Sequence, residues 1–153
     1  MQRGTIRGRE SADASLREML AHLNVIDAGI DTIGPSAGPD MSDATRDLLS
    51  RLELLAFLAA RLKVPDVARI TESLEELVLA SHMRPHRQGD DVSATMRHGV
   101  DVLMLLTHDA MRQIHGHPPA ELRSATLALL DRVEQVIRAC DAIKPPAVRA
   151  AGL

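Results

Sequence analysis

The sequence predicts an all-α fold, an antiparallel up-down bundle of about five helices, and three observations lead to this prediction. The 153 residues include one Phe and no Trp or Tyr, so the core must be aliphatic, and most aliphatic residues that are abundant here favour helices. Apolar residues recur at steps of three and four along the chain. Gly and Pro divide the chain into segments of helical length.

The first predicted helix spans residues 13–33. Residues 1–10 contain two glycines and little apolar content, so we expect a flexible N-terminus there, with the bundle over 11–146 and a tail over 147–153. Gly34 and Pro35 end the helix. Its apolar stripe consists of Leu16, Met19, Leu20, Leu23, Ile26, Ile30 and Ile33.

The second predicted helix spans residues 43–63, with Ser42 as its N-cap. Its core stripe consists of Leu48, Leu52, Leu55, Ala59 and Leu62. Other positions around the same helix are apolar as well. A helix that is hydrophobic on most sides is either central in a bundle or docked on a partner. This helix is therefore the first candidate for an interaction surface.

Three further helices complete the predicted bundle. Pro65 breaks the chain after the second helix and starts the third, which ends at Arg84 and Pro85. Asp90 or Asp91 caps the fourth helix, which Gly116 ends. The fifth runs to Lys144 and carries an apolar stripe of Leu122, Thr126, Leu129, Val133, Val136, Ile137, Cys140 and Ile143. Short connections make successive helices antiparallel neighbours.

Composition excludes several classes of function. The net charge is −3, and the three arginines near the N-terminus are too few to predict binding of nucleic acid. No apolar run approaches the length of a membrane span, and the N-terminus lacks the apolar core of a signal peptide, so we expect a cytoplasmic protein. The single Cys140 excludes an internal disulfide and is expected to be a buried core residue.

No pattern of residues predicts an enzyme, a cofactor or a metal site. A metal site needs three or four converging ligands, and the seven histidines are not spaced to provide them. Pro85 separates His82 from His86, and His108 and His115 lie two turns apart. We find no serine nucleophile motif, phosphate-binding glycine loop or zinc-protease motif. We therefore expect no catalytic residues.

The stretch from Leu48 to Val78 resembles the centre of histidine-phosphotransfer (HPt) domains, and is most similar to the N-terminal phosphotransfer domain of chemotaxis kinases of the CheA type. Lys63 to Arg69, KVPDVAR, matches the family's turn and the start of its next helix. Ser73 to Leu77, SLEEL, matches that next helix. The resemblance implies a four-helix HPt-like core with a fifth C-terminal helix. It also implies a role in two-component phosphorelay.

The signature of phosphotransfer is absent from this chain. Aligned from Pro65 backwards, Glu53 occupies the position of the phosphoaccepting histidine, and Ala56 and Phe57 occupy the lysine and glycine positions. A carboxylate is not an equivalent phosphoryl carrier, alanine cannot balance phosphoryl charge, and phenylalanine fills the space that glycine leaves for the receiver domain. The resemblance therefore implies a pseudo-HPt domain that does not carry phosphate at the usual site.

We expect the retained function to be docking of a response-regulator receiver domain or a histidine kinase. The predicted partner-binding residues share one face of the second helix because they lie at steps of three and four. They are Arg46, Leu49, Ser50, Glu53, Ala56, Phe57 and Ala60. The competing interpretation places Phe57 and Leu49 in the core and makes Glu53 an ordinary surface charge.

Two other functions remain open at this point. The chain could be a helical scaffold or oligomerisation protein unrelated to phosphorelay. It could also be an HPt protein that is phosphorylated on a non-standard histidine, for which His22 and His98 are the candidates. The exposure of Glu53 and Phe57 is the structural feature that separates docking from a purely structural helix.

Overall fold

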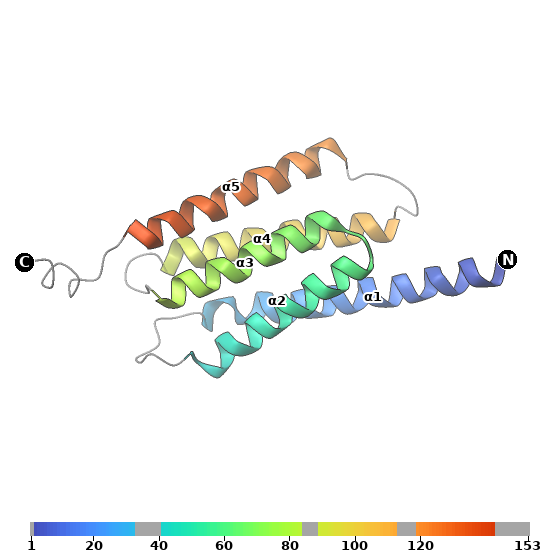
Figure 1. Ribbon diagram of the computed structural model, residues 1–153, viewed down its shortest axis with the longest axis horizontal. Helices are drawn as coiled ribbons and strands as arrows, with labels where there is room; N and C mark the ends of the chain where they lie inside the picture. The colour runs from blue at the N-terminus through green and yellow to red at the C-terminus, as the bar shows by residue number, and fades with distance from the viewer. Residues whose placement is uncertain (1, 33–40, 84–88, 113–118, 143–153) are drawn as a thin grey trace, which may run out of the picture.

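The structure is a computed structural model that describes residues 2–32, 41–83, 89–112 and 119–142. Over these ranges the chain forms α-helices and one short 3-10 helix, without strands (Figure 1). The elements in order are α1 (Gln2–Gly29), η1 (Ile30–Thr32), α2 (Asp43–Arg61), α3 (Pro65–Met83), α4 (Gly89–Arg112) and α5 (Ala120–Ala142). The predicted all-α fold is confirmed.

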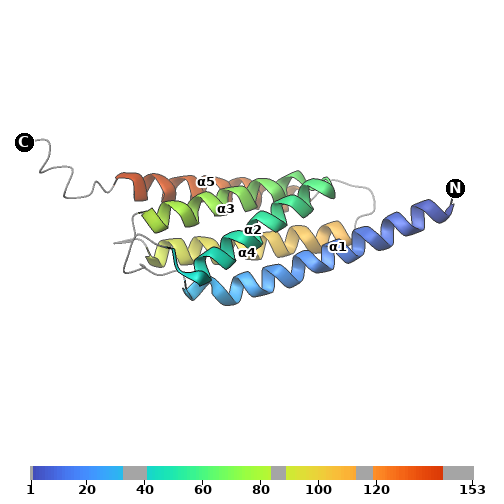
Figure 2. The same ribbon diagram turned by 60° about the horizontal axis from the view of Figure 1, so that its bottom comes forward.

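Helices α1 to α4 form a ring, and α5 packs against its outside. Each of α1, α2 and α3 contacts the next helix in the chain, and α1 closes the ring by contacting α4. Helix α5 contacts both α3 and α4, so it covers the face that those two helices share (Figures 1 and 2). The bundle therefore consists of a four-helix core and a fifth C-terminal helix, as predicted.

The first helix begins much earlier than predicted. Helix α1 starts at Gln2, whereas we placed the start at Asp13 and expected residues 1–10 to be flexible. Gly4 and Gly8 each weaken a helix by about 1 kcal/mol relative to alanine, but that does not oblige the helix to end. The first turns of α1 extend past the other helices (Figures 1 and 2). At its other end α1 tightens into η1, and Ile33 lies outside the described residues.

The core is aliphatic, as the near absence of aromatic residues required. Its largest fully buried side chains include Met19, Leu23, Ile26, Leu52 and Leu55 of the first two predicted stripes. Helices α3 and α4 add Ile70, Leu74, Leu77, Met96, Leu103 and Leu106. Three buried threonines, Thr71, Thr107 and Thr126, donate their hydroxyl to the carbonyl one turn earlier, as Thr71 does to Val67 at 2.6 Å. Because their polar groups are satisfied in this way, they do not oppose burial. Cys140 is buried, as predicted.

The connection between α2 and α3 is a tight turn with a specific backbone geometry. Lys63 has a φ of 57°, in the left-handed region, so α2 ends at Arg61, two residues before the predicted end. The Val64 amide donates to the Ala59 carbonyl at 2.9 Å, and Pro65 starts α3. This turn makes α2 and α3 antiparallel neighbours. At the other end of α2, Ser42 is the predicted N-cap and accepts from the Thr45 amide at 3.2 Å.

A glycine allows α3 and α4 to approach closely. A Cβ atom placed on Gly99 would lie 2.8 Å from both terminal methyl carbons of Leu74, which is fully buried. Real side chains do not tolerate that separation without moving a neighbour. The close approach fixes the shared face of α3 and α4 on which α5 packs. No helix in the described ranges has the combined length and hydrophobicity needed to cross a membrane.

Candidate docking surface

Helix α2 places all seven predicted partner-binding residues on the side that points away from the core. Its inward side buries six residues: Thr45, Leu48, Leu52, Leu55, Leu58 and Ala59. On the outward side, Arg46, Ser50, Glu53, Phe57 and Ala60 are exposed. Leu49 and Ala56 are partly buried, and Leu49 packs against the core. The face expected from the sequence therefore exists as a surface, with two of its members acting as its border with the core.

Phe57 is the most informative residue on this surface. It is the only aromatic residue of the chain, and 58% of it is exposed. The Arg61 guanidinium lies over its ring, 5.9 Å from the centroid, at the outer limit for a cation–π contact. Aromatic side chains gain most from burial and are enriched at interfaces. The core does not use Phe57, so the interpretation of Phe57 as a core residue is not supported.

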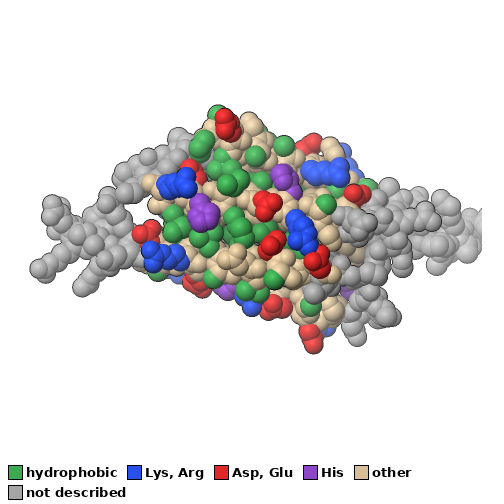
Figure 3. Space-filling model, turned by 180° about the vertical axis from the view of Figure 1, so that it is seen from behind, with side chains coloured by type: hydrophobic (Ala, Val, Ile, Leu, Met, Phe, Trp, Pro, Cys, Tyr) green, Lys and Arg blue, Asp and Glu red, His purple; other side chains and the backbone are tan. Residues whose placement is uncertain are grey.

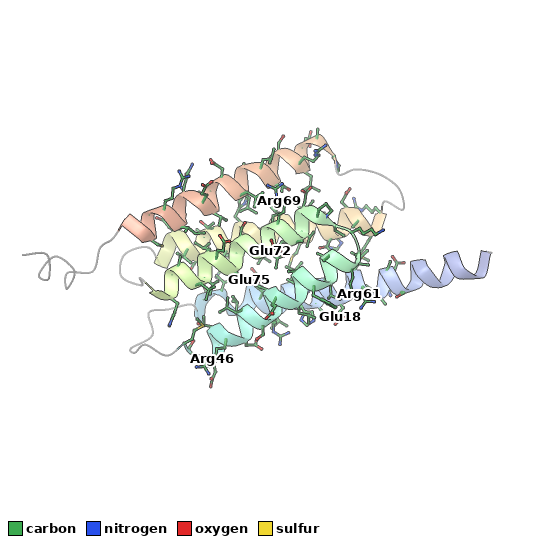
Figure 4. All side chains as sticks on the ribbon, viewed as in Figure 1. Glu18, Arg46, Arg61, Arg69, Glu72 and Glu75 are labelled. Atoms are coloured by element: carbon green, nitrogen blue, oxygen red, sulfur yellow. The ribbon has the colours of Figure 1, made fainter. Side chains whose placement is uncertain are left out.

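Glu75 of α3 lies near Glu53 of α2 and near Glu72 of its own helix. Burial raises the pKa of the Glu75 carboxyl, and the negative charges of Glu53 and Glu72 raise it further. Helices α2 and α3 pack directly against each other, so a charge on one helix can act on a carboxyl group of the other. Glu72 and Glu75 project from the middle of α3, whereas Arg46 and Arg61 lie towards the two ends of α2 (Figure 4). The centre of the surface is therefore negative, and an arginine lies near each end of α2.

The α3 residues of this surface were not predicted, because the periodicity of α2 does not show which residues of a neighbouring helix lie level with it. Helices α2 and α3 are antiparallel, so Leu79, one turn after Glu75, lies level with Leu49, one turn before Glu53. Leu79 is 45% exposed. The sequence feature that could have predicted them is the short turn at Val64–Pro65, because a short turn fixes which residues of the two helices lie level with each other. We call the surface the α2–α3 face and define it by Glu53, Phe57, Ala60, Ala68, Glu72, Glu75 and Leu79.

A chain of polar contacts borders this face on the α1 side. The His22 Nδ1 and the Arg51 guanidinium are 3.0 Å apart, and the Arg51 Nε donates to Asp47 at 3.0 Å. The Glu18 carboxylate lies 3.7 Å from the His22 Nε2. Because a guanidinium has donors only, the His22 Nδ1 must accept, and the ring hydrogen lies on Nε2. These contacts fix α1 against α2.

The surroundings of His22 and His98 do not favour either histidine as an alternative phosphoacceptor. The His22 Nδ1 is 3.0 Å from the Arg51 guanidinium and the Nε2 is 3.7 Å from the Glu18 carboxylate, so both ring nitrogens face other side chains of the bundle. His98 is exposed on α4, on the other side of the bundle core from α2. Neither histidine has a lysine and a glycine in the family's order.

Other surfaces of the molecule are less distinctive. Viewed from the side opposite to Figure 1, basic, acidic and histidine side chains are interspersed among hydrophobic ones (Figure 3). Leu105 of α4 and Leu127 of α5 are the most exposed large apolar residues outside the α2–α3 face. A groove of about 520 Å³ runs between α3 and α5, and its lining includes Arg69, Glu76, Glu134 and Arg138. Among the described residues, no three His, Cys, Asp or Glu side chains are placed to hold a metal ion.

Comparison with known proteins gives no neighbour from which to transfer a function. No family model matches the chain, and no match was found among curated proteins or solved structures.

Proposed function

We propose that this chain is an HPt-like signalling module that docks a response-regulator receiver domain through the outward side of α2, without carrying phosphate there. The exposure of Phe57 beside Glu53 carries this proposal. The only aromatic side chain of the protein is 58% exposed on a helix whose opposite side is fully packed. A side chain of this kind is expected to be buried by a partner.

The choice of a receiver domain rests on the resemblance to HPt domains. The segments Lys63–Arg69 and Ser73–Leu77 carry that resemblance, and a bundle of four helices with a fifth C-terminal helix is compatible with it. In this family the equivalent side of the second helix meets the receiver. A histidine kinase is the other partner that the resemblance implies.

The absence of phosphate transfer rests on chemistry at three positions. Glu53 offers a carboxylate where the family has an imidazole, Ala56 removes a cation, and Phe57 adds bulk. The contacts of His22 with Arg51 and Glu18 also argue against that histidine as a substitute acceptor. A module of this kind would act by occupying receivers and competing with active phosphotransfer proteins.

The proposal is tested by measuring the affinity of the full chain for purified receiver domains of its source organism by calorimetry. At least one receiver is expected to bind the wild type in the micromolar range, about −8 kcal/mol. Glu53→Arg and Phe57→Ala are expected to weaken binding about tenfold or more, because both change the centre of the surface. Glu121→Arg, an exposed position in the first turn of α5, is the matched control and should bind normally.

Two results would overturn the proposal. The first is that no receiver binds, with self-association of the chain in sedimentation, which would favour a scaffold. The second is stable transfer of labelled phosphate from a phosphorylated receiver to the chain. Loss of that label in His22→Gln or His98→Gln would identify a non-standard phosphohistidine.

A further inference from the structure

The α2–α3 face is the only one of its kind in the described part of the ring, because it combines an exposed aromatic residue with small side chains and uncovered acidic groups. Helix α5 covers the neighbouring face of α3 and α4, whereas no described helix covers α2 and α3 (Figure 1). Beside Phe57, the turn end of the face carries two small residues, of which Ala60 is exposed and Ala68 is partly buried. Small residues allow the backbone of another helix to approach closely.

No ion pair among the described residues neutralises the acidic groups of the face. Asp31, Asp47, Asp91 and Glu134 each pair with an arginine. None of the ion pairs among the described residues involves the three glutamates Glu53, Glu72 and Glu75. Burial raises the pKa of Glu75, and the negative charges of Glu53 and Glu72 raise it further. A cation placed among them would remove the repulsion and stabilise the ionised carboxylates.

We propose that the α2–α3 face accepts an amphipathic helix of the partner, which presents a Lys or Arg to Glu53, Glu72 and Glu75 and covers Phe57 and Leu79 with apolar side chains. This inference rests on the proposed function for the location of the docking surface and adds the chemistry of its occupant. The cation is inferred because it would complement the negative charge of the glutamates. Its apolar neighbours are inferred because Phe57 and Leu79 are exposed. Arg46 and Arg61 at the ends of α2 favour neutral or acidic residues at the ends of the partner helix.

The test uses three synthetic amphipathic helices of Ala, Leu and Gln that differ only at one central position, which is Lys, Gln or Glu. Binding to the full chain is measured by calorimetry at low salt, and its location by amide chemical shifts. The Lys peptide is expected to bind about tenfold more tightly than the Gln peptide, as one charge-assisted hydrogen bond allows, and the Glu peptide most weakly. The shifts should lie on α2 and α3.

Variants separate the charge from the apolar contact. The double variant Glu53→Gln with Glu75→Gln should remove the preference for Lys, whereas Glu121→Gln with Glu134→Gln on α5 should retain it. Phe57→Ala should weaken all three peptides by a similar factor and keep their order. Thermal melting of each variant establishes that it is folded. Equal affinities for the three peptides, an unchanged preference in the first double variant, or shifts confined to α4 and α5 would overturn the inference.

Failure of this inference can be distinguished from failure of the proposed function. If the Lys peptide is preferred but no receiver domain binds, the cationic helix is the correct occupant and the receiver is not its source. If a receiver binds and the Glu53→Gln, Glu75→Gln variant binds it equally well, docking stands and recognition of a cation is wrong.

Discussion

Helix α3 contributes to two outward faces of the four-helix core. Another helix covers one of them, and no described helix covers the other. On one side it forms a face with α4, and α5 covers that face with the buried residues Leu129, Val133 and Val136. On the other side it forms a face with α2, which keeps three glutamates and an exposed Phe57. An apolar helix could not cover these carboxylates without a desolvation penalty. The difference separates a face used for folding from a face that is available for binding.

The largest expected effect comes from truncating one large side chain on each face. Leu129→Ala should lower the free energy of unfolding by about 2–5 kcal/mol, because it leaves a cavity under α5. Phe57→Ala should change it by about 0.5 kcal/mol or less, because the ring is mostly in water. Chemical denaturation followed by circular dichroism measures both values. Equal losses would mean that the α2–α3 face also serves folding.

The next effect concerns the close approach of α3 and α4 beneath α5. Gly99→Ala should destabilise the bundle by about 1 kcal/mol. Overpacking against Leu74 costs about 1–3 kcal/mol, and the better helix propensity of alanine offsets about 1 kcal/mol of that loss. Adding Leu74→Val should reduce the loss of stability caused by Gly99→Ala, since it shortens the side chain that the new methyl group would contact. A stability gain from Gly99→Ala alone would show that the helices can separate freely.

A smaller effect on stability is expected at the border between α1 and the α2–α3 face. His22 and Arg51 are in hydrogen-bond contact, and the pair is partly buried. A double-mutant cycle with His22→Ala and Arg51→Ala should give a coupling of about 0.5–1.5 kcal/mol in the free energy of unfolding. The pair Glu134 and Arg138 on the exposed side of α5 is the control, with an expected coupling of about 0.5 kcal/mol or less. Equal couplings would contradict a specific role for His22.

The smallest effect on stability belongs to Glu75. Its pKa is raised in the folded state, mainly by burial, so the folded chain holds this proton more tightly than the unfolded chain. The folded chain therefore loses stability as the pH rises from about 4, where the unfolded carboxyl ionises, through the higher folded pKa. Glu75→Gln should remove this decline and raise the stability at pH 7 by about 0.5 kcal/mol or less. Denaturation of both proteins at pH 4 and pH 7 measures it, and a larger decline in the variant would contradict the assignment.

The sequence predicted the residues under α5 more completely than those of the α2–α3 face. Steps of three and four identified the buried residues of α5, such as Leu129 and Val133, because burial follows helical periodicity directly. Periodicity did not predict the start of α1, where polar residues continue the helix without a core stripe. It placed Glu53 and Phe57 on one side of α2 but did not decide their exposure, which depends on where the neighbouring helices lie.

The contribution of α3 to the α2–α3 face could be identified only from the structure. Glu72, Glu75 and Leu79 look like ordinary surface positions of an amphipathic helix when α3 is read alone. They join Glu53 only through the antiparallel packing that follows the turn at Lys63. A face shared by two helices depends on their relative register, and register is a tertiary property.

The most direct test of the docking claim is to titrate the isotope-labelled full chain with the receiver domain that binds it most tightly, and to map the amide shifts. We predict that the shifts gather on α2 between Arg46 and Arg61 and on α3 between Glu72 and Leu79, while α5 is unaffected. Shifts centred on α4 or α5, or no binding by any receiver of the source organism, would contradict docking through the α2–α3 face.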